Sequence, residues 1–165
     1  EPMEVEKAAL ALDAALPRGI RVLAADTVDT HHAALMSQAA GASYRVTLPY
    51  SGDVSAAVAE FNAAPELLFK KAAPKTKAKF KEIDVKFYIP QLTAEQTEKE
   101  TIFSFDCKIT PTGSMKAVDL LNALNEQYGL ELPVEMADIE RLRLYRNNKN
   151  GKPIPMLNSD AVTLG

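Results

Sequence analysis

Apolar and polar residues alternate in two stretches of the chain, and this alternation predicts strands with one buried face. The first carries Tyr44, Val46 and Leu48, and the second runs from Phe103 to Ile109. Ile20 to Val28 is apolar on both sides, which predicts a strand that is covered on both faces. Ile139 to Tyr145 is the last predicted strand.

Other segments between these strands have apolar residues at helical spacing. Glu4 to Leu16 is rich in alanine and leucine and ends at a proline, so we expect a short helix there. A second helix is predicted to begin at Asp53, because apolar residues recur at helical spacing as far as Phe61. Ser114 is predicted to cap a third helix from Met115 to Tyr128.

Three segments do not follow these periods. Residues 75–89 are predicted to be extended, with Ile83, Val85, Phe87 and Ile89 on one strand face. Residues 91–100 are polar and predict a surface loop, and residues 147–165 predict a loose C-terminal tail. Strands and helices therefore mix without strict alternation, which favours an α+β fold: an antiparallel sheet with helices packed on one face.

Composition limits the class of protein. A chain of 165 residues, 47% hydrophobic and 25% charged, predicts one globular domain spanning residues 1–165. The formal net charge of −3 predicts no general attraction to nucleic acid. No apolar run approaches the roughly 20 residues that cross a bilayer, so we expect no membrane contact and a cytoplasmic location. Because the sequence begins at Glu1 directly before a predicted helix, we expect the C-terminal fragment of a longer polypeptide.

Few side chains are suited to metal or cofactor chemistry. Iron–sulfur clusters generally need three or four ligands, and structural zinc needs four, but Cys107, His31 and His32 are the only cysteine and histidine residues. The glycines are isolated and form no phosphate-binding loop, and Cys107 has no nucleophile motif around it. We therefore predict no metal site, no cofactor and no catalytic residue.

A lysine-rich stretch is the pattern that most favours binding. Its last four lysines are two residues apart, which on a strand would place them on one face about 6.6 Å from one another. That arrangement would contact RNA phosphates without reading sequence, although alternating lysines are also typical of a protected edge strand. On one continuous strand, the apolar residues Ile83, Val85 and Phe87 would lie on the same face as these lysines. We therefore expect a turn or bulge near Lys81 to Ile83 and a projecting hairpin. The candidate residues are Lys70, Lys71, Lys75, Lys77, Lys79 and Lys81.

The last predicted strand carries a second basic group. Arg141, Arg143 and Tyr145 alternate along it and are expected to share one face. Tyr145 would then be placed to stack on a nucleic-acid base.

A longer set of short motifs resembles one protein family. These motifs include LPRGIRVLAA from Leu16, the Tyr44-Arg45-Val46 strand, Lys81 to Val85, and Gly113-Ser114 before a Leu-Leu-Asn helix. Together they resemble a radical-SAM-linked bacterial family, a domain of unknown function found beside or fused to cobalamin-binding radical SAM proteins. The resemblance implies a radical SAM protein as partner, either fused or encoded separately.

The stretch from Leu12 to Leu48 is also similar to a segment of tRNA pseudouridine synthases. This resemblance implies a ferredoxin-like, pseudouridine-synthase-like substructure and favours tRNA or rRNA as a partner. The Gly-Arg-Thr-Asp context that holds the nucleophile of those synthases is absent from the 165 residues. The resemblance therefore implies a scaffold without the activity.

Three functions remain open at this stage. The chain is an accessory domain that binds RNA, a docking domain for a radical SAM protein, or an RNA-modifying enzyme. The enzyme hypothesis would use Asp84, Asp106 or His32 and is the least favoured, because no motif connects these residues.

Overall fold

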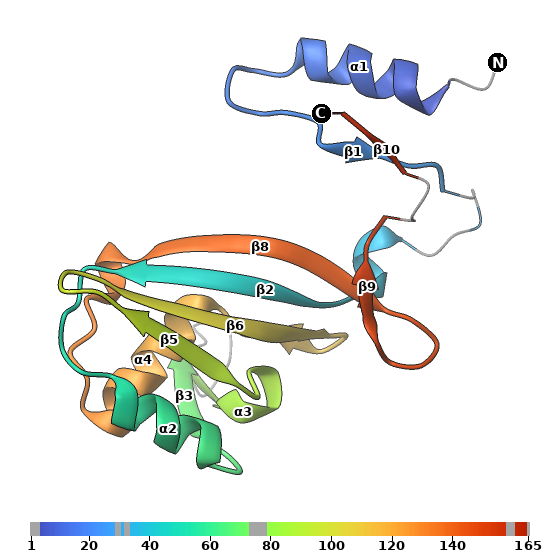
Figure 1. The fold of residues 1–165 in the computed structure, drawn as a ribbon. Helices are drawn as coiled ribbons and strands as arrows, with labels where there is room; N and C mark the ends of the chain where they lie inside the picture. The colour runs from blue at the N-terminus through green and yellow to red at the C-terminus, as the bar shows by residue number, and fades with distance from the viewer. Residues whose placement is uncertain (1–3, 29–30, 32–33, 73–78, 158–160, 165) are drawn as a thin grey trace.

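Three long strands form the centre of an antiparallel sheet in the computed structural model, which describes residues 4–28, 31, 34–72, 79–157 and 161–164. They are β2 (Ala39–Leu48), β6 (Thr101–Thr110) and β8 (Asp138–Asn147). The full strand order is β5-β6-β2-β8-β9, with the short strands β5 (Leu92–Gln96) and β9 (Pro153–Pro155) at the edges (Figure 1). A short strand, β7 (Gly113–Ser114), pairs with the end of β6.

Helices cover one face of this sheet (Figure 1). The two longest of them are α2 (Ser55–Ala63) and α4 (Ala117–Tyr128), and a single turn, α3 (Val85–Tyr88), lies beside them. Phe61 of α2 and Leu120 and Leu124 of α4 are fully buried against Val46 and Phe103 of the sheet. The predicted α+β fold, an antiparallel sheet with helices on one face, is confirmed.

The main elements follow the order β2-α2-β5-β6-α4-β8. With the inserted hairpin and the single turn α3 left out, this order of strands and helices is βαββαβ. Short 3₁₀ helices precede β2 (Leu35–Gln38) and β8 (Val134–Met136). The chain between α2 and β5 is long enough to hold an inserted hairpin.

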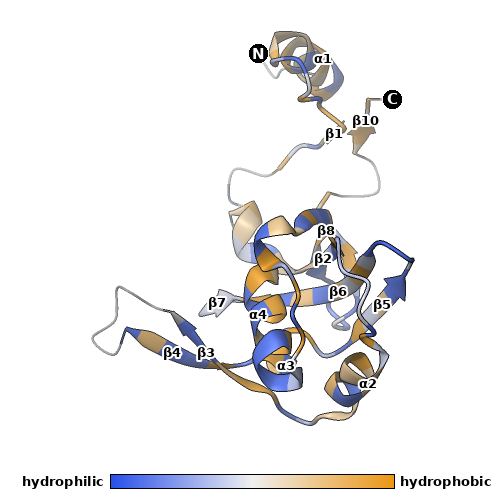
Figure 2. Cartoon of the chain, turned by 90° about the vertical axis from the view of Figure 1, so that its left-hand side faces the viewer, coloured by the Kyte–Doolittle hydropathy of each residue, from blue (hydrophilic) through white to orange (hydrophobic). Residues whose placement is uncertain are grey.

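That hairpin consists of β3 (Leu68–Ala72) and β4 (Phe80–Asp84), which pair only with each other among the described strands. Figure 2 shows it projecting from the body of the molecule. Phe69, opposite Ile83, is buried and fixes the base of the hairpin. The hairpin therefore has an anchored root and an exposed arm.

The N- and C-terminal segments form a small unit of their own (Figures 1 and 2). It contains α1 (Val5–Ala15) and the two-stranded pair of β1 (Ala24–Ala25) with β10 (Val162–Thr163). Asp13 holds the turn after α1, because its carboxylate accepts hydrogen bonds from the Arg21 side chain at 2.9 Å and the Val22 amide at 2.7 Å. Leu10, Leu12, Leu23 and Val28 of this unit are more than half exposed.

Several local predictions were wrong for identifiable reasons. Val85 to Tyr88 form a helical turn rather than a strand, because the Asp84 carboxylate accepts hydrogen bonds from the Leu67 and Lys86 amides and turns the chain. The third helix begins at Ala117, close to the predicted start, but its cap differs: the Asp119 carboxylate, and not Ser114, accepts a hydrogen bond from the backbone amide of Lys116. Residues 20–28 contain only the two-residue strand β1.

Two predicted irregular segments also contain strands. Within residues 91–100, β5 pairs with β6 from Leu92 to Gln96, although Leu92 is its one buried side chain. Within residues 147–165, β9 extends the main sheet and β10 pairs with β1. Backbone pairing therefore forms β5, β9 and β10, which the local sequence pattern does not predict. The division of the chain into domains stays a prediction.

Candidate nucleic-acid interface

The predicted lysine-rich hairpin is present, but its lysines are arranged differently from the prediction. Lys70 and Lys71 belong to β3, Lys81 belongs to β4, and Lys79 lies just before β4. Lys79 has a φ of +58°, a left-handed conformation that interrupts an extended strand. Lys79 and Lys81 therefore do not lie on the same face of one continuous strand. The irregularity lies at Lys79 rather than between Lys81 and Ile83, which are paired regularly. Lys75 and Lys77 lie outside the described residues.

The hairpin register brings like charges together. Lys71 lies directly opposite Lys81, whereas Lys70 lies opposite Glu82. Like charges at directly opposed positions of an antiparallel pair destabilise it. The Asp119 carboxylate of α4 offsets part of this repulsion, because it lies 2.5 Å from the Lys71 ammonium group.

This ion pair bridges one side of a groove between the hairpin and α4. The groove has a volume of about 430 Å³. Its floor includes Phe69, which is 7% exposed, and its lining includes Phe80, which is 60% exposed. The remaining lining residues are Lys70, Lys71, Lys116, Val118, Asp119, Asn122, Asn125 and Glu126. Two of the predicted lysines thus meet residues of a distant helix.

The second predicted basic group is divided by a β-bulge in β8. Arg143 pairs with Ser43, but Arg141 pairs with Tyr44, so Leu142 is an extra residue on β8. β2 itself is regular here, since it pairs with β6 without a shift. Ser43 and Tyr44 point to opposite faces, and their partners do likewise. The prediction that Arg141 shares a face with Arg143 and Tyr145 was wrong.

Tyr145 is packed into the sheet rather than presented to solvent. It is 9% exposed, and its ring occupies the space that a Cβ atom at Gly41 would need. The Arg143 guanidinium lies 5.8 Å from the ring centroid. Burial, followed by the nearby Asp106 charge, raises the pKa of the Tyr145 phenol. Stacking of this ring on a base would require it to leave its place over Gly41.

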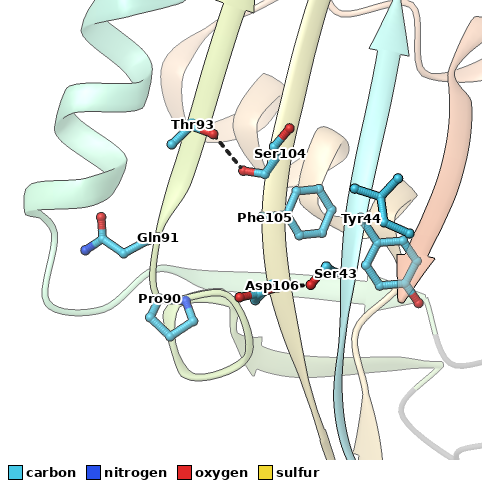
Figure 3. A pocket seen from close by; sticks show the side chains of 9 residues that line it. Ser43, Tyr44, Pro90, Gln91, Thr93, Ser104, Phe105 and Asp106 are labelled. Carbon is cyan, nitrogen blue, oxygen red and sulfur yellow. Dashed lines mark hydrogen bonds between the residues drawn. The ribbon is translucent and has the colours of Figure 1, made fainter. Parts of the chain in front are cut away.

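A second cavity lies on the sheet beside this position (Figure 3). It has a volume of about 440 Å³ and extends from β8 across β2 and β6 to β5. Ser43 connects two charged neighbours, because its hydroxyl donates to the Asp106 carboxylate and accepts from Arg143 Nε at 2.7 Å. Sequence reasoning missed this cluster, since only strand pairing brings the three residues together. The lining residues are Ser43, Tyr44, Pro90, Gln91, Thr93, Ser104, Phe105, Asp106 and Leu142.

The residues of the enzyme hypothesis do not converge in this cavity. Among the described residues that line the cavity, Asp106 is the one that carries a charge, and none of the other described lining residues is a second charged acid–base partner. Asp84 is committed to the hydrogen bonds that begin α3. His32 lies outside the described residues.

Cys107 is 2% exposed, and burial raises the pKa of its thiol above the ordinary value of 9.0. Its thiol donates a hydrogen bond to the Met115 carbonyl at 3.5 Å. Within the described residues, no group of three or more histidine, cysteine, aspartate or glutamate side chains could hold a metal ion. None of the described helices has both the length and the apolar character needed to span a membrane.

These features define the class of the protein: an α+β domain of βαββαβ order with a basic hairpin inserted between α2 and β5. Residues 1–126 match the family described as "Uncharacterized protein conserved in bacteria (DUF2344)", and the chain belongs to this family. The matched region contains the hairpin lysines, whereas Arg141, Arg143 and Tyr145 lie beyond it. No curated protein and no solved structure gives a significant match.

Proposed function

We propose that this chain is a non-catalytic accessory domain that binds RNA through the β3–β4 hairpin and acts with a radical SAM protein. The observation that carries the RNA proposal is the presence of Lys70 and Lys81 on the two strands of an arm that projects from the body of the molecule, where neither forms an ion pair with another described residue. Phosphate groups lying along the arm would supply these lysines with anionic partners. The radical SAM partner rests on the family resemblance of the sequence.

The charge of the hairpin differs from that of the whole chain. The chain has a net charge of −3, yet four lysines are described on and beside the two hairpin strands. Lys70, Lys79 and Lys81 are exposed and form no ion pair with another described residue. Exposed lysines without a carboxylate partner retain their charge for phosphate contacts, which are sequence-independent.

Salt-dependent binding of fluorescent RNA to the full chain tests the proposal. Neutralising Lys70, Lys79 and Lys81 to Gln removes three charges and leaves the Lys71–Asp119 pair intact. The matched control neutralises three exposed lysines elsewhere, Lys99, Lys149 and Lys152. For a single strand each lost phosphate contact changes the slope of log K against log salt by about 0.7, so the hairpin variant should lose about two units of slope.

The control variant should keep the slope of the unaltered protein. Two results would overturn the proposal. One is the absence of RNA binding by the unaltered chain at low ionic strength. The other is an equal loss of slope in the hairpin variant and the control, because that would show an effect of overall charge alone.

The α1–β1–β10 unit favours a second function, docking on the radical SAM partner. Leu10, Leu12 and Leu23 of this unit are exposed, and in its described part Ala9 is the one buried hydrophobic residue. Apolar side chains that a small unit does not bury internally are typical of protein contacts. Replacing Leu12 and Leu23 with Gln should abolish co-elution with a co-expressed radical SAM protein and leave RNA affinity unchanged. Co-elution that survives this change would exclude the unit as the docking surface.

A further inference from the structure

We infer that the groove between the β3–β4 hairpin and α4 binds an unpaired nucleotide, and that the domain therefore selects single-stranded RNA over duplex RNA. This inference rests on the proposed RNA function and adds the part of the RNA that is recognised. Phosphates alone would be held equally well by an arm of lysines without a groove. The groove adds an aromatic face, a free amide and a defined volume.

Phe80 supplies the aromatic face. Its side chain is 60% exposed although it lines a concave surface, while Phe69, which also lines the groove, is buried in the core. An exposed phenyl ring beside lysines is the combination found in single-strand binding sites, where bases stack on rings and cations hold the backbone. A base stacked on Phe80 would cover an apolar surface that is otherwise in water.

Asn122 supplies the free amide. Two asparagines line the groove, but both polar atoms of the Asn125 side chain are bonded to Leu132: its amide donates to the carbonyl at 3.1 Å and its oxygen accepts from the N–H at 2.9 Å. Asn122 is exposed, and its side chain forms no hydrogen bond to another described residue. Its side chain can therefore bond the edge of a base, which requires one donor and one acceptor.

The charges of the groove fit a phosphodiester as well as a base. Asp119 is paired with Lys71, and the other charged residues of the described lining are Lys70, Lys116 and Glu126. The balance is positive by one charge, enough to favour one phosphate over a neutral ligand. The volume of about 430 Å³ lies within the range of roughly 300–1,000 Å³ found for small-molecule sites.

A duplex cannot use this site. Bases within a helix are stacked on both faces, and in A-form RNA their edges lie in grooves that side chains read poorly. A base must be unstacked before it can enter a pocket of this size, which costs least when it is already unpaired. The groove therefore distinguishes strands by their pairing state.

The first experiment compares the unaltered full chain with RNA of two kinds, a labelled unstructured single strand and the same strand annealed to its complement. Tighter binding of the single strand at equal salt is expected. Equal affinity would overturn the inference without involving any variant.

The second experiment replaces Phe80 with Leu, which keeps an apolar side chain and removes the ring. The matched control is Phe87→Leu, since Phe87 is also exposed, at 51%, but lies outside the groove lining. Loss of one stacked base predicts about 5- to 150-fold weaker single-strand binding by Phe80→Leu, with an unchanged salt slope and an unchanged affinity for duplex. Phe87→Leu should bind like the unaltered protein.

Asn122→Ala completes the set. It should reduce the differences in affinity among homopolymeric single strands, because the base edge would no longer be read. The outcomes separate the two proposals. Binding that depends on Lys70, Lys79 and Lys81 but not on Phe80 would overturn the groove and keep the RNA function, whereas no RNA binding at all would overturn both.

Discussion

Asn62 should be among the most important polar side chains for stability, although it lies outside the candidate interface. It occupies the last turn of α2 and bonds twice to Leu92, the first residue of β5. Its amide donates to the Leu92 carbonyl at 2.7 Å, and its carbonyl oxygen accepts from the Leu92 N–H at 2.9 Å. β5 is an edge strand, and the Asn62 side chain bonds the backbone groups of Leu92 as a neighbouring strand would.

The cost of Asn62→Ala can be worked from these contacts. Leu92 is 1% exposed, so its two backbone groups would lose their partners in a buried position. Each buried group left unsatisfied costs about 1–3 kcal/mol, and water entering the space of the lost side chain reduces the cost to the lower end. Two groups therefore predict about 2–4 kcal/mol. Alanine returns roughly 0.5 kcal/mol through its higher helix propensity.

Asn122→Ala is the matched control for stability, because Asn122 is an exposed asparagine within a helix and has only the propensity gain. Urea unfolding at constant protein concentration gives the free energy of both variants from the midpoint and the m-value. Asn62→Ala should be less stable than Asn122→Ala by about 2–4 kcal/mol. A difference below about 0.5 kcal/mol would show that the two hydrogen bonds contribute nothing net, and the reasoning would be refuted.

Two further predictions concern a helix end and the response to alkali. Gly129 ends α4 at a φ of +64°, and a Cβ there would meet no atom within 4 Å. Gly129→Ala should therefore cost about 1–2 kcal/mol through the backbone alone, measured by urea unfolding, and Gly129→Asn should cost less. Burial raises the pKa of Cys107 above 9.0 and those of Tyr128 and Tyr145 above 10.0. The folded state then holds these protons more tightly than the unfolded state, so stability is full below about pH 9 and falls as the pH rises further. Cys107→Ala should move the start of that fall towards pH 10, and an unchanged pH profile would contradict the assignment.

The sequence predicts those parts of the fold in which a local pattern coincides with burial. From Phe103 to Cys107, β6 alternates because every second residue enters the core, and α4 has both an apolar face and a glycine at its end. β5 was missed because it is an edge strand with one buried side chain. Its order comes from pairing with β6 and from Gln96, whose amide donates to the Gly52 carbonyl at 2.8 Å.

The candidate interface could be predicted only in part for a similar reason. The lysines form a visible charge pattern, and a hairpin is predicted because the lysines and the apolar residues after them would otherwise share one strand face. The groove was not visible, because Lys71 and Asp119 are 48 residues apart and meet only when the hairpin folds against α4. The side of the sheet on which Arg141 lies depends on the bulge in β8. That bulge arises from pairing with β2, and the sequence of β8 alone does not indicate it.

The hairpin can be removed from this fold at a defined position. The register pairs Phe69 with Ile83, and both strands diverge from the core beyond this pair. A two-residue Asn-Gly turn suits the twist of such a strand pair, so residues 70–82 can be replaced by Asn-Gly. Asn62 would still join α2 to the start of β5.

The shortened chain should therefore unfold cooperatively in urea with a stability near that of the unaltered protein. It should also lose both the salt-dependent and the single-strand-selective components of RNA binding. Retained RNA affinity in a folded, shortened chain would place the binding surface elsewhere, with Arg143 and the free sheet face as the next candidates. Loss of folding would instead show that the arm contributes to stability, and the Lys71–Asp119 contact is the first interaction to test. In that case a milder change, Lys71→Met in the full hairpin, should reproduce most of the loss, because it removes the same contact and keeps the chain length.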